Sequence, residues 1–212
     1  MDAPGLWIVA VGASGSQGMH DLRELLAALP VPFPAVLLAV VHRPADRVSY
    51  LREFLAAGSE IPVGVASEGE RLRAGVCYIG EPAAHLTLGP DGAAHLVADP
   101  GATYRNRTID LLFGSLAKVA VSRLIGVVLS GALDDGSRGL AAISVAGGQV
   151  MVLTPYDGGS EMPANAIRFD GPPDFVGAVP ELAREIARVV SRPADRDAAR
   201  ASEGEAGRPR SA

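Results

Sequence analysis

The chain has 212 residues, a length that suits one well-buried domain with or without a tail. Its 48% hydrophobic and 20% charged residues are ordinary for a soluble globular protein, and a net charge of -5 without a basic block disfavours nucleic acid as a partner. Cys77 is the single cysteine, so a disulfide framework and a cysteine-rich metal site are excluded. The amino terminus lacks a basic region, and no apolar run approaches the roughly 20 residues of a membrane span. We therefore expect a cytoplasmic protein without membrane insertion.

The first predicted elements are a short strand and a helix joined by a glycine-rich turn. Trp7 to Val11 form an apolar run typical of a buried strand, and the turn follows at residues 12–18. A strand that turns sharply into a helix exposes the turn at the carboxyl edge of the sheet, where α/β proteins bind their ligands. Ser14 is the residue of this turn that can do chemistry. The helical spacing that follows has apolar residues at Met19, Leu22, Leu25, Leu26 and Leu29.

Three motifs and one structural role compete for this turn. The dinucleotide fingerprint G-x-G-x-x-G is matched only in part, because Ser14 replaces the middle glycine and the acidic residue about 20 positions later is missing. A phosphate-binding P-loop needs a lysine, which the turn lacks. The nucleophile elbow G-x-S-x-G fits at Gly12 and Ser14 but ends in Ser16. The structural role is that of a helix cap, which a serine in this position can also fill.

The next segments predict a parallel sheet. Ala35 to Val41 form a continuous apolar run, typical of a strand buried on both faces, and the run ends at His42. Residues 46–57 have helical spacing, and Gly58 closes them. Strand, helix, strand and helix in this order predict a parallel α/β sheet with right-handed crossovers.

The middle of the chain has the pattern of short strands. Residues 61–66 and 76–80 are predicted as two of them, and 86–88 and 95–97 flank the turn at 89–92 as a β-hairpin. We expect this middle part to be an antiparallel addition to the sheet.

The second half returns to alternating helices and strands. Thr108 is expected to cap a helix, and Leu124 to Leu129 form another buried strand. The fold class is therefore α/β, a three-layer, doubly wound, mostly parallel sheet with an antiparallel hairpin addition. We expect one domain over residues 1–192 and a disordered tail over 193–212, where the apolar content is almost entirely alanine. Further elements are expected around Leu140 to Ile143 (helix), Gln149 to Leu153 (strand), Met162 to Ile167 (helix) and Leu182 to Val190 (helix).

Three polar residues share one position in this predicted sheet. Ser14 follows the first strand, His42 ends the second, and Asp135 follows the strand at 124–129. All three are expected at the carboxyl edge of the sheet, so they can converge in one crevice. An imidazole can take the proton of a serine, and a carboxylate can fix the tautomer of that imidazole, so the set is complete for acyl transfer. The alternatives are a histidine that is merely a satisfied polar residue and an aspartate that belongs to a turn or a helix cap.

From Leu6 to Val190 the chain resembles the catalytic domain of the chemotaxis protein-glutamate methylesterases (CheB-type). The family triad falls on Ser14, His42 and Asp135, the residues that the strand ends select. The resemblance also implies substrate and oxyanion binding by Gly15, Ser16, Gly131 and Ala132, and it implies no cofactor or metal. The landmarks, in the order of the family, are Val11-Gly12-Ala13-Ser14; Val40-Val41-His42-Arg43-Pro44; Gly69-Glu70 with Gly75-Val76-Cys77-Tyr78-Ile79 and His85-Leu86; Ile109-Asp110-Leu111-Leu112-Phe113-Gly114-Ser115; Gly126-Val127-Val128-Leu129-Ser130-Gly131 with Asp135-Gly136; and Met162-Pro163 with Ala166-Ile167.

The chain also departs from the family pattern near the predicted oxyanion site. A Gly-Gly pair shortly after the serine is replaced by Gly15-Ser16-Gln17-Gly18, and a methionine associated with the oxyanion hole is replaced by Ala132. Asn106-Arg107-Thr108 stands where the family has Arg-Pro-Ser. Family members often carry an amino-terminal receiver domain, but here only residues 1–6 precede the first strand, so we expect regulation by a separate receiver protein.

The expected function is that of a protein-glutamate methylesterase. The resemblance implies that it removes methyl esters from glutamates on the cytoplasmic helices of methylated chemoreceptors, with glutamine deamidation as a side activity. One rival is a binding or regulatory module of the same fold with weakened catalysis, which the changed glycine loop and Ala132 motivate. The other is a dinucleotide-binding domain, which rests on the spacing of Gly12, Gly15 and Gly18 alone.

Overall fold

The centre of the structure is formed by the most apolar strands of the chain. In the computed structural model, β1 (Trp7–Ser14) lies between β2 (Ala35–His42) and β7 (Leu124–Val128) and pairs with both in parallel. All three strands are buried along their length, except for the last residues of β1 and β2. The continuous apolar runs follow from this burial, because both faces of the central strands are covered by helices.

The structure describes residues 6–42, 49–101, 103–104, 106–119, 123–156, 161–169 and 171–192. Within them, a parallel sheet has the strand order β3-β4-β2-β1-β7-β8-β9. The outer strands of this sheet are β3 (Val63–Val65), β4 (Cys77–Ile79), β8 (Gln149–Leu153) and β9 (Phe175–Gly177). The expected tail at 193–212 and the boundary before it lie outside the described residues.

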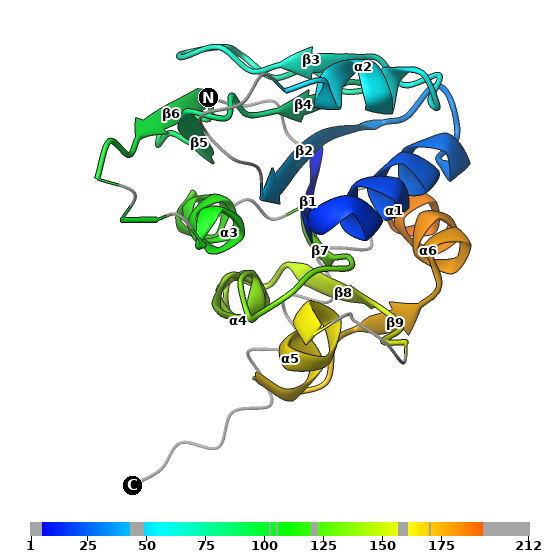
Figure 1. Cartoon of the computed structure of the whole chain (residues 1–212). Coiled ribbons are helices and arrows are strands. Elements are labelled where there is room, and N and C mark those ends of the chain that lie inside the picture. The colour runs from blue at the N-terminus through cyan, green and yellow to red at the C-terminus, as the bar shows by residue number, and fades with distance from the viewer. Residues whose placement is uncertain are drawn as a thin grey trace, which may run out of the picture.

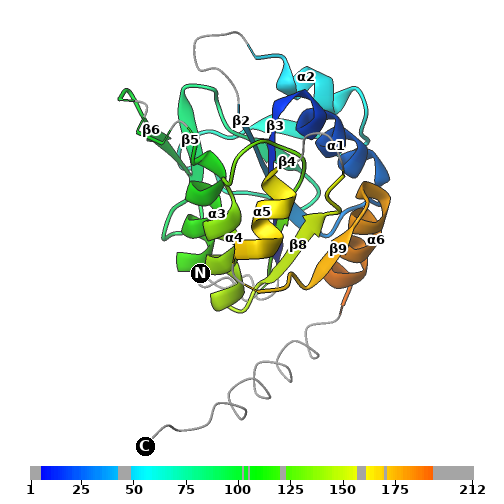
Figure 2. The same ribbon diagram turned by 60° about the horizontal axis from the view of Figure 1, so that its bottom comes forward.

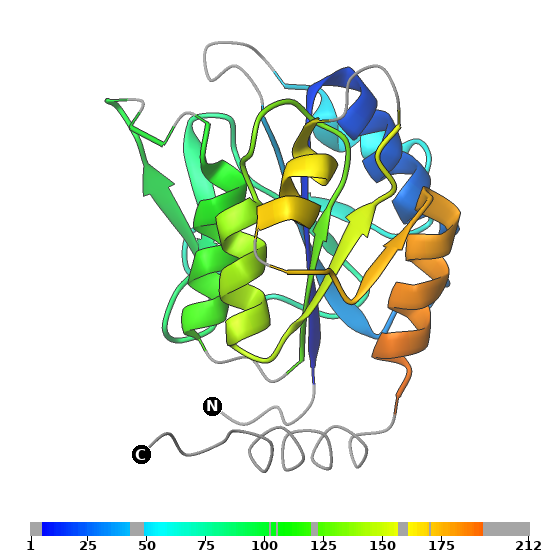
Figure 3. The same ribbon diagram turned by 90° about the horizontal axis from the view of Figure 1, so that it is seen from below.

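Helices cover both faces of the sheet and complete the three layers. One face carries α1 (Gly15–Ala28), α2 (Leu51–Ala56) and α6 (Val179–Val190), and the other carries α3 (Thr108–Lys118), α4 (Ser137–Val145) and α5 (Glu161–Phe169), as Figures 1 and 3 show. Each face has its own apolar core. The predicted doubly wound α/β fold is therefore confirmed. None of the described helices is both long and apolar enough to cross a membrane.

The middle of the chain differs from the expected antiparallel addition. Among the strands of the described residues, only β5 (Ala84–Leu88) and β6 (Ala94–Ala98) pair in antiparallel fashion, and they form a two-stranded sheet of their own beside α3. β3 and β4 instead pair in parallel within the main sheet, because the connection between them is long enough to return the chain to the same edge. The expected helix at 46–57 is described only from residue 49 and is helical at Leu51–Ala56.

The strand order reverses at β1, and this determines where a ligand can bind. From β1 the chain adds β2 on one side, by way of α1, and it later adds β7 on the other side. The helices that follow β1 and β7, α1 and α4, therefore lie on opposite faces of the sheet (Figures 1 and 2). A crevice outside the carboxyl ends of the strands forms at such a switch point.

The single cysteine provides a test of how tightly this sheet is packed. Cys77 lies in β4, pairs with Leu37 and Val63, and is fully buried, and this burial raises the pKa of its thiol to about 12. We expect native protein at pH 8 to leave Cys77 unlabelled by a maleimide over hours, because the thiolate is the reactive form and the sulfur is covered. The same sample in urea should be labelled completely. Rapid labelling of the native protein, followed by mass spectrometry, would contradict this packing.

Candidate active site

The first predicted site residue, Ser14, lies at the end of β1 where the chain enters α1. Its backbone N–H donates to the carbonyl oxygen of Ser130 at 2.9 Å, which ties the end of β1 to the loop after β7. The next residue, Gly15, has φ +71°, a left-handed conformation that favours glycine and makes the turn sharp. Ser14 occupies the N-cap position of α1, but its side chain makes no capping hydrogen bond. The hydroxyl is therefore not used as a cap.

His42 ends the neighbouring strand in register with Ser14. The two residues are paired across β1 and β2, and the alternation of side chains puts both on the face that carries α3, α4 and α5. His42 Nε2 lies 2.6 Å from Asp135 Oδ2, and the two side chains are 16% and 1% exposed. A carboxylate can only accept, so Nε2 carries the proton of this bond, and Nδ1 is the nitrogen that can act on the Ser14 hydroxyl.

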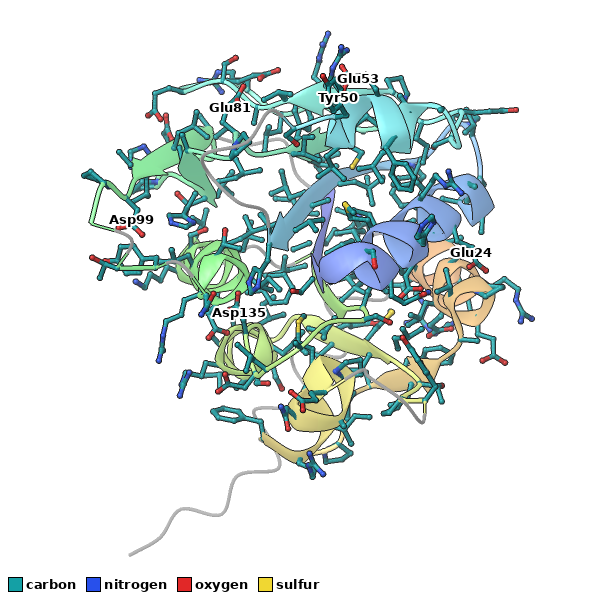
Figure 4. The ribbon with its side chains drawn as sticks, in the orientation of Figure 1. Glu24, Tyr50, Glu53, Glu81, Asp99 and Asp135 are labelled. Carbon is teal, nitrogen blue, oxygen red and sulfur yellow. The ribbon has the colours of Figure 1, made fainter. Side chains whose placement is uncertain are left out.

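Asp135 is held by the amino-terminal end of a helix as well as by His42. Its Oδ2 accepts from the backbone N–H of Ile109 at 2.9 Å, and its Oδ1 accepts from that of Asp110 at 2.9 Å. Figure 4 shows Asp135 where the ends of α3 and α4 meet. A negative charge is favourable in this position, because the first N–H groups of a helix have no partner within the helix and the helix dipole is positive at this end.

The structure contradicts the prediction that Thr108 caps α3. Thr108 is the first residue of the helix, and the N-cap position is taken by Arg107, which makes no side-chain capping bond. The capping carboxylate comes from Asp135 in a distant loop. The prediction was wrong because a local residue was chosen for a role that a tertiary contact fills.

A second carboxylate completes a reciprocal pair of caps. Asp110 Oδ1 accepts from the backbone N–H groups of Gly136 at 3.0 Å and Gly139 at 2.7 Å, at the start of α4. Burial raises the pKa of Asp110, and the nearby charge of Asp135 raises it further, while the Gly139 and Gly136 bonds and Arg138 oppose the rise. Asp110 Oδ2 is buried and has no hydrogen-bond partner, although Arg138 Nη1 lies 3.8 Å from it.

The four residues predicted to bind substrate or an oxyanion lie in two loops beside Ser14. Gly15 and Ser16 are exposed at the start of α1, and Ala132 is exposed in the loop after β7. Gly131 is buried, and a Cβ on it would lie 2.7 Å from Ser14 Cβ and 2.1 Å from Met162 Sδ. Gly131 therefore allows the loop to approach Ser14 directly.

The loop after β7 is fastened to the start of α5. Gly131 O accepts from Met162 N–H at 3.0 Å, and Leu133 N–H donates to Glu161 Oε2 at 3.2 Å. Asn165 Nδ2 donates to Leu133 O at 2.7 Å. Leu133 has φ +68°, an uncommon conformation for leucine, and these bonds on both sides of it hold the strained backbone in place.

One of the residues that replace the family Gly-Gly pair, the exposed Gln17, takes part in a polar link to the buried Asp21. Gln17 Nε2 donates to Asp21 Oδ1 at 2.7 Å, and Asp21 Oδ2 accepts from Ser130 N–H at 3.3 Å. Asp21 is 4% exposed. The link joins the first turn of α1 to the loop that carries Gly131. Hydrogen bonds therefore hold the altered glycine loop in place.

A recess opens beside His42 on the side of β4, away from Ser14. Its polar lining includes His85, whose Nε2 lies 3.3 Å from Asp99 Oδ2, and Glu81 on the β4–β5 loop (Figure 4). Thr108 at the start of α3 also lines the recess. The recess gives space next to the imidazole for part of a bound molecule.

Three residues of the site were not selected from the sequence. Asp110 belongs to one of the sequence blocks that carry the family resemblance. An acidic residue in the first turn of a helix is ordinary, so it gives no sign that Asp110 caps a second helix. Asp21 gives a clearer signal, because it is a charged residue on the apolar side of a predicted helix. Met162 was also part of a landmark, and its contact with Gly131 depends on the packing of α5.

Comparison with known proteins identifies the family. The CheB methylesterase family model matches residues 9–186. The chain belongs to the CheB methylesterase family. A protein-glutamate methylesterase/protein-glutamine glutaminase of Paraburkholderia xenovorans is 34% identical over 196 residues, which are 89% of this chain and 52% of that protein. One from Photorhabdus laumondii is 38% identical over 143 residues, 66% of this chain and 40% of that protein.

A solved structure extends the comparison to three dimensions. The crystal structure of the Thermotoga maritima CheB methylesterase catalytic domain is similar with a TM-score of 0.76 at 26% identity, over 87% of this chain and 99% of that one. The chain spans about half the length or less of the curated CheB relatives described above.

The close approach at Gly131 can be tested by adding one methyl group. We expect Gly131→Ala to displace Met162 or the Ser14 loop and to destabilise the protein by about 1–3 kcal/mol, a typical cost of overpacking. Gly114→Ala in α3 is the matched control, because its Cβ meets nothing within 4 Å. The control should be neutral or stabilising by about 0.5–1 kcal/mol. Urea unfolding of both variants measures the difference, and equal midpoints would contradict the packing.

The raised pKa of Asp110 predicts a pH-dependent stability. An acid whose folded pKa lies above its unfolded value contributes stability that is present below the unfolded pKa and is lost as the pH rises through the folded one. The free energy of unfolding of wild type minus that of Asp110→Asn should therefore fall as the pH rises from about 4. Urea unfolding from pH 4 to 8 measures it. Asp134→Asn, at an exposed neighbouring carboxylate, is the control. A difference that rises with pH would contradict the prediction.

Proposed function

We propose that this chain is a protein-glutamate methylesterase, a serine hydrolase that removes methyl esters from glutamate side chains. The observation that carries the proposal is the 2.6 Å contact of His42 with the buried Asp135, next to Ser14 in register on the adjacent strand. Membership of the CheB methylesterase family supports the same chemistry.

The acylation step uses the three residues in the roles that their positions favour. His42 Nδ1 takes the proton of the Ser14 hydroxyl as Oγ attacks the carbonyl carbon of the methyl ester. The tetrahedral intermediate then collapses, the bond to the methoxy oxygen breaks, and the proton on Nδ1 leaves with methanol. Asp135 keeps the proton on Nε2 and stabilises the imidazolium. No hydrogen bond joins Ser14 and His42 in this structure, and we propose that their contact tightens when substrate binds, as catalytic hydrogen bonds often do.

Deacylation repeats these steps with water. His42 removes a proton from water, the hydroxide attacks the acyl carbon on Ser14, and the serine oxygen leaves with the proton from Nδ1. The products are a glutamate carboxylate and free Ser14. A glutamine side chain passes through a similar intermediate and releases ammonia in place of methanol, so glutamine deamidation is the proposed side activity. The names of the relatives from Paraburkholderia and Photorhabdus contain both activities.

Backbone amides are the proposed stabilisers of the oxyanion. The exposed start of α1 at Gly15 and Ser16 and the exposed Ala132 lie in the loops on either side of Ser14. Fixed N–H donors near the reacting carbon stabilise developing negative charge without reorganisation. The bonds from α5 to the 131–133 loop support such a fixed arrangement despite the replacement of the family methionine by Ala132.

The proposed substrate is the methylated cytoplasmic helix of a chemoreceptor, with a separate receiver protein as regulator. The site needs no cofactor for the steps above. We propose a cytoplasmic location, where both partners would be found.

Methanol release from methylated receptor membranes of the source organism tests the proposal. We expect release by wild type and a loss of more than about 10³-fold with Ser14→Ala, because the nucleophile is removed. Ser144→Ala, an exposed serine of α4, is the matched control and should retain full activity. Release that survives in Ser14→Ala would contradict the serine mechanism. Release by neither protein, with binding to the membranes retained, would favour the binding module with weakened catalysis.

The role of Asp135 gives a separate prediction. Asp135→Asn keeps the size of the side chain but removes the carboxylate that fixes the His42 tautomer, so kcat should fall by about 10²–10⁴-fold. KM should change little, because the carboxyl group is 1% exposed and cannot contact substrate. Steady-state kinetics on a soluble methyl ester separates the two parameters. A change in KM alone would mean that Asp135 acts in binding.

A further inference from the structure

The amino-terminal ends of α3 and α4 are capped by each other's carboxylates. Asp135, before α4, accepts from the backbone N–H groups of Ile109 and Asp110 in α3. Asp110, in α3, accepts from those of Gly136 and Gly139 at the start of α4. All four distances lie between 2.7 and 3.0 Å. The two caps therefore form one closed set of bonds.

The bond from Gly136 is the one that bears on His42. The N–H of Gly136 belongs to the peptide group that follows Asp135, so Asp110 Oδ1 holds the backbone directly attached to that residue. Gly136 has φ +94°, and a Cβ there would lie 3.0 Å from Ile109 Cγ2, so the turn is tightly confined. The carboxyl group of Asp135 must satisfy two N–H groups and His42 at once, and this leaves little freedom for its backbone.

We propose that Asp110 is a positioning residue for the His42–Asp135 pair and acts by holding the Asp135 backbone through its accepted hydrogen bonds. It touches neither His42 nor the reacting atoms, so it is not a catalytic residue. The proposal rests on the proposed function only in so far as the pair serves esterase chemistry. Other charged groups near Asp110 are Asp135 and Arg138, and Arg138 also lies 3.8 Å from the exposed Asp134.

A residue that only stabilises the junction of α3 and α4 would give a different result from a positioning residue. Loss of stability lowers the melting temperature but leaves the bond between His42 and Asp135 intact in the folded molecules. Displacement of the Asp135 backbone weakens the bond between His42 and Asp135 in the folded state itself. The His42 Nε2 proton, observed by NMR far downfield when it is held by a carboxylate, reports the bond without any need for activity.

The test compares three variants of the whole chain. Asp110→Ala removes the acceptor, and we expect kcat to fall by about 10–100-fold with KM within about 3-fold of wild type, together with loss of the downfield His42 signal. Asp110→Asn keeps an oxygen at Oδ1 for Gly136 and Gly139, so it should restore the signal and bring kcat to within about 3-fold of wild type. Asp134→Ala removes the neighbouring carboxylate, which makes no cap, and should change neither.

His42→Gln assigns the NMR signal among the four histidines. If Asp110→Ala does not fold, Asp110→Glu, which moves the carboxylate by one methylene, takes its place.

Two results would overturn the proposal. The first is an unchanged His42 signal and kcat in folded Asp110→Ala with only a lower melting temperature. The second is an Asp110→Asn protein as impaired as Asp110→Ala, because the accepted bonds would then not be what matters. If wild type hydrolyses no methyl ester, the function fails, but the NMR comparison still decides whether Asp110 positions the pair.

Discussion

The exchange of carboxylate caps between α3 and α4 is the interaction on which the site depends. A helix leaves its first N–H groups without partners inside the helix, and the carboxylates of Asp110 and Asp135 meet that need across the junction. Asp135 thereby gains two hydrogen-bond donors in a place where it is almost fully buried, and a buried polar group without partners would be costly. Its carboxylate also accepts the hydrogen bond from His42 Nε2–H, so one side chain joins the end of β2 to the start of α3.

Close packing around this junction relies on glycines at positions where side chains of α3 contact the neighbouring backbone. A Cβ at Gly139 would lie 2.5 Å from Phe113 Cβ, and one at Gly12 would lie 2.3 Å from Ile109 Cγ2. These two positions let α3 sit against both α4 and β1. The distance between α3 and α4 in turn decides whether Asp110 and Asp135 can reach the opposite helix. Small residues in the interior thus support the polar contacts at its edge.

Much of this arrangement follows from patterns in the sequence. The apolar run that ends at His42 predicts a doubly covered parallel strand, and the rule that parallel strands share a carboxyl edge brings Ser14 and Asp135 to the same place. What the patterns could not supply is the partner of each polar group. Asp110 looks like an ordinary residue of a first helical turn, and only the packing of α3 on α4 makes it a cap. β9 was missed because three residues, Phe175–Gly177, carry too little periodicity, and the parallel pairing of β3 and β4 depends on the path of their connection.

The contact between His42 and Asp135 joins residues 93 positions apart in the chain. Closing so long a loop costs conformational entropy before any contact repays it, so pairings of this kind tend to form late in folding. β7 must have joined β1 before the loop that carries Asp135 can face the end of β2. A molecule in which β7 has detached from β1 therefore loses the contact between His42 and Asp135 as well. The contact at the edge of the sheet thus depends on the pairing of strands at its centre.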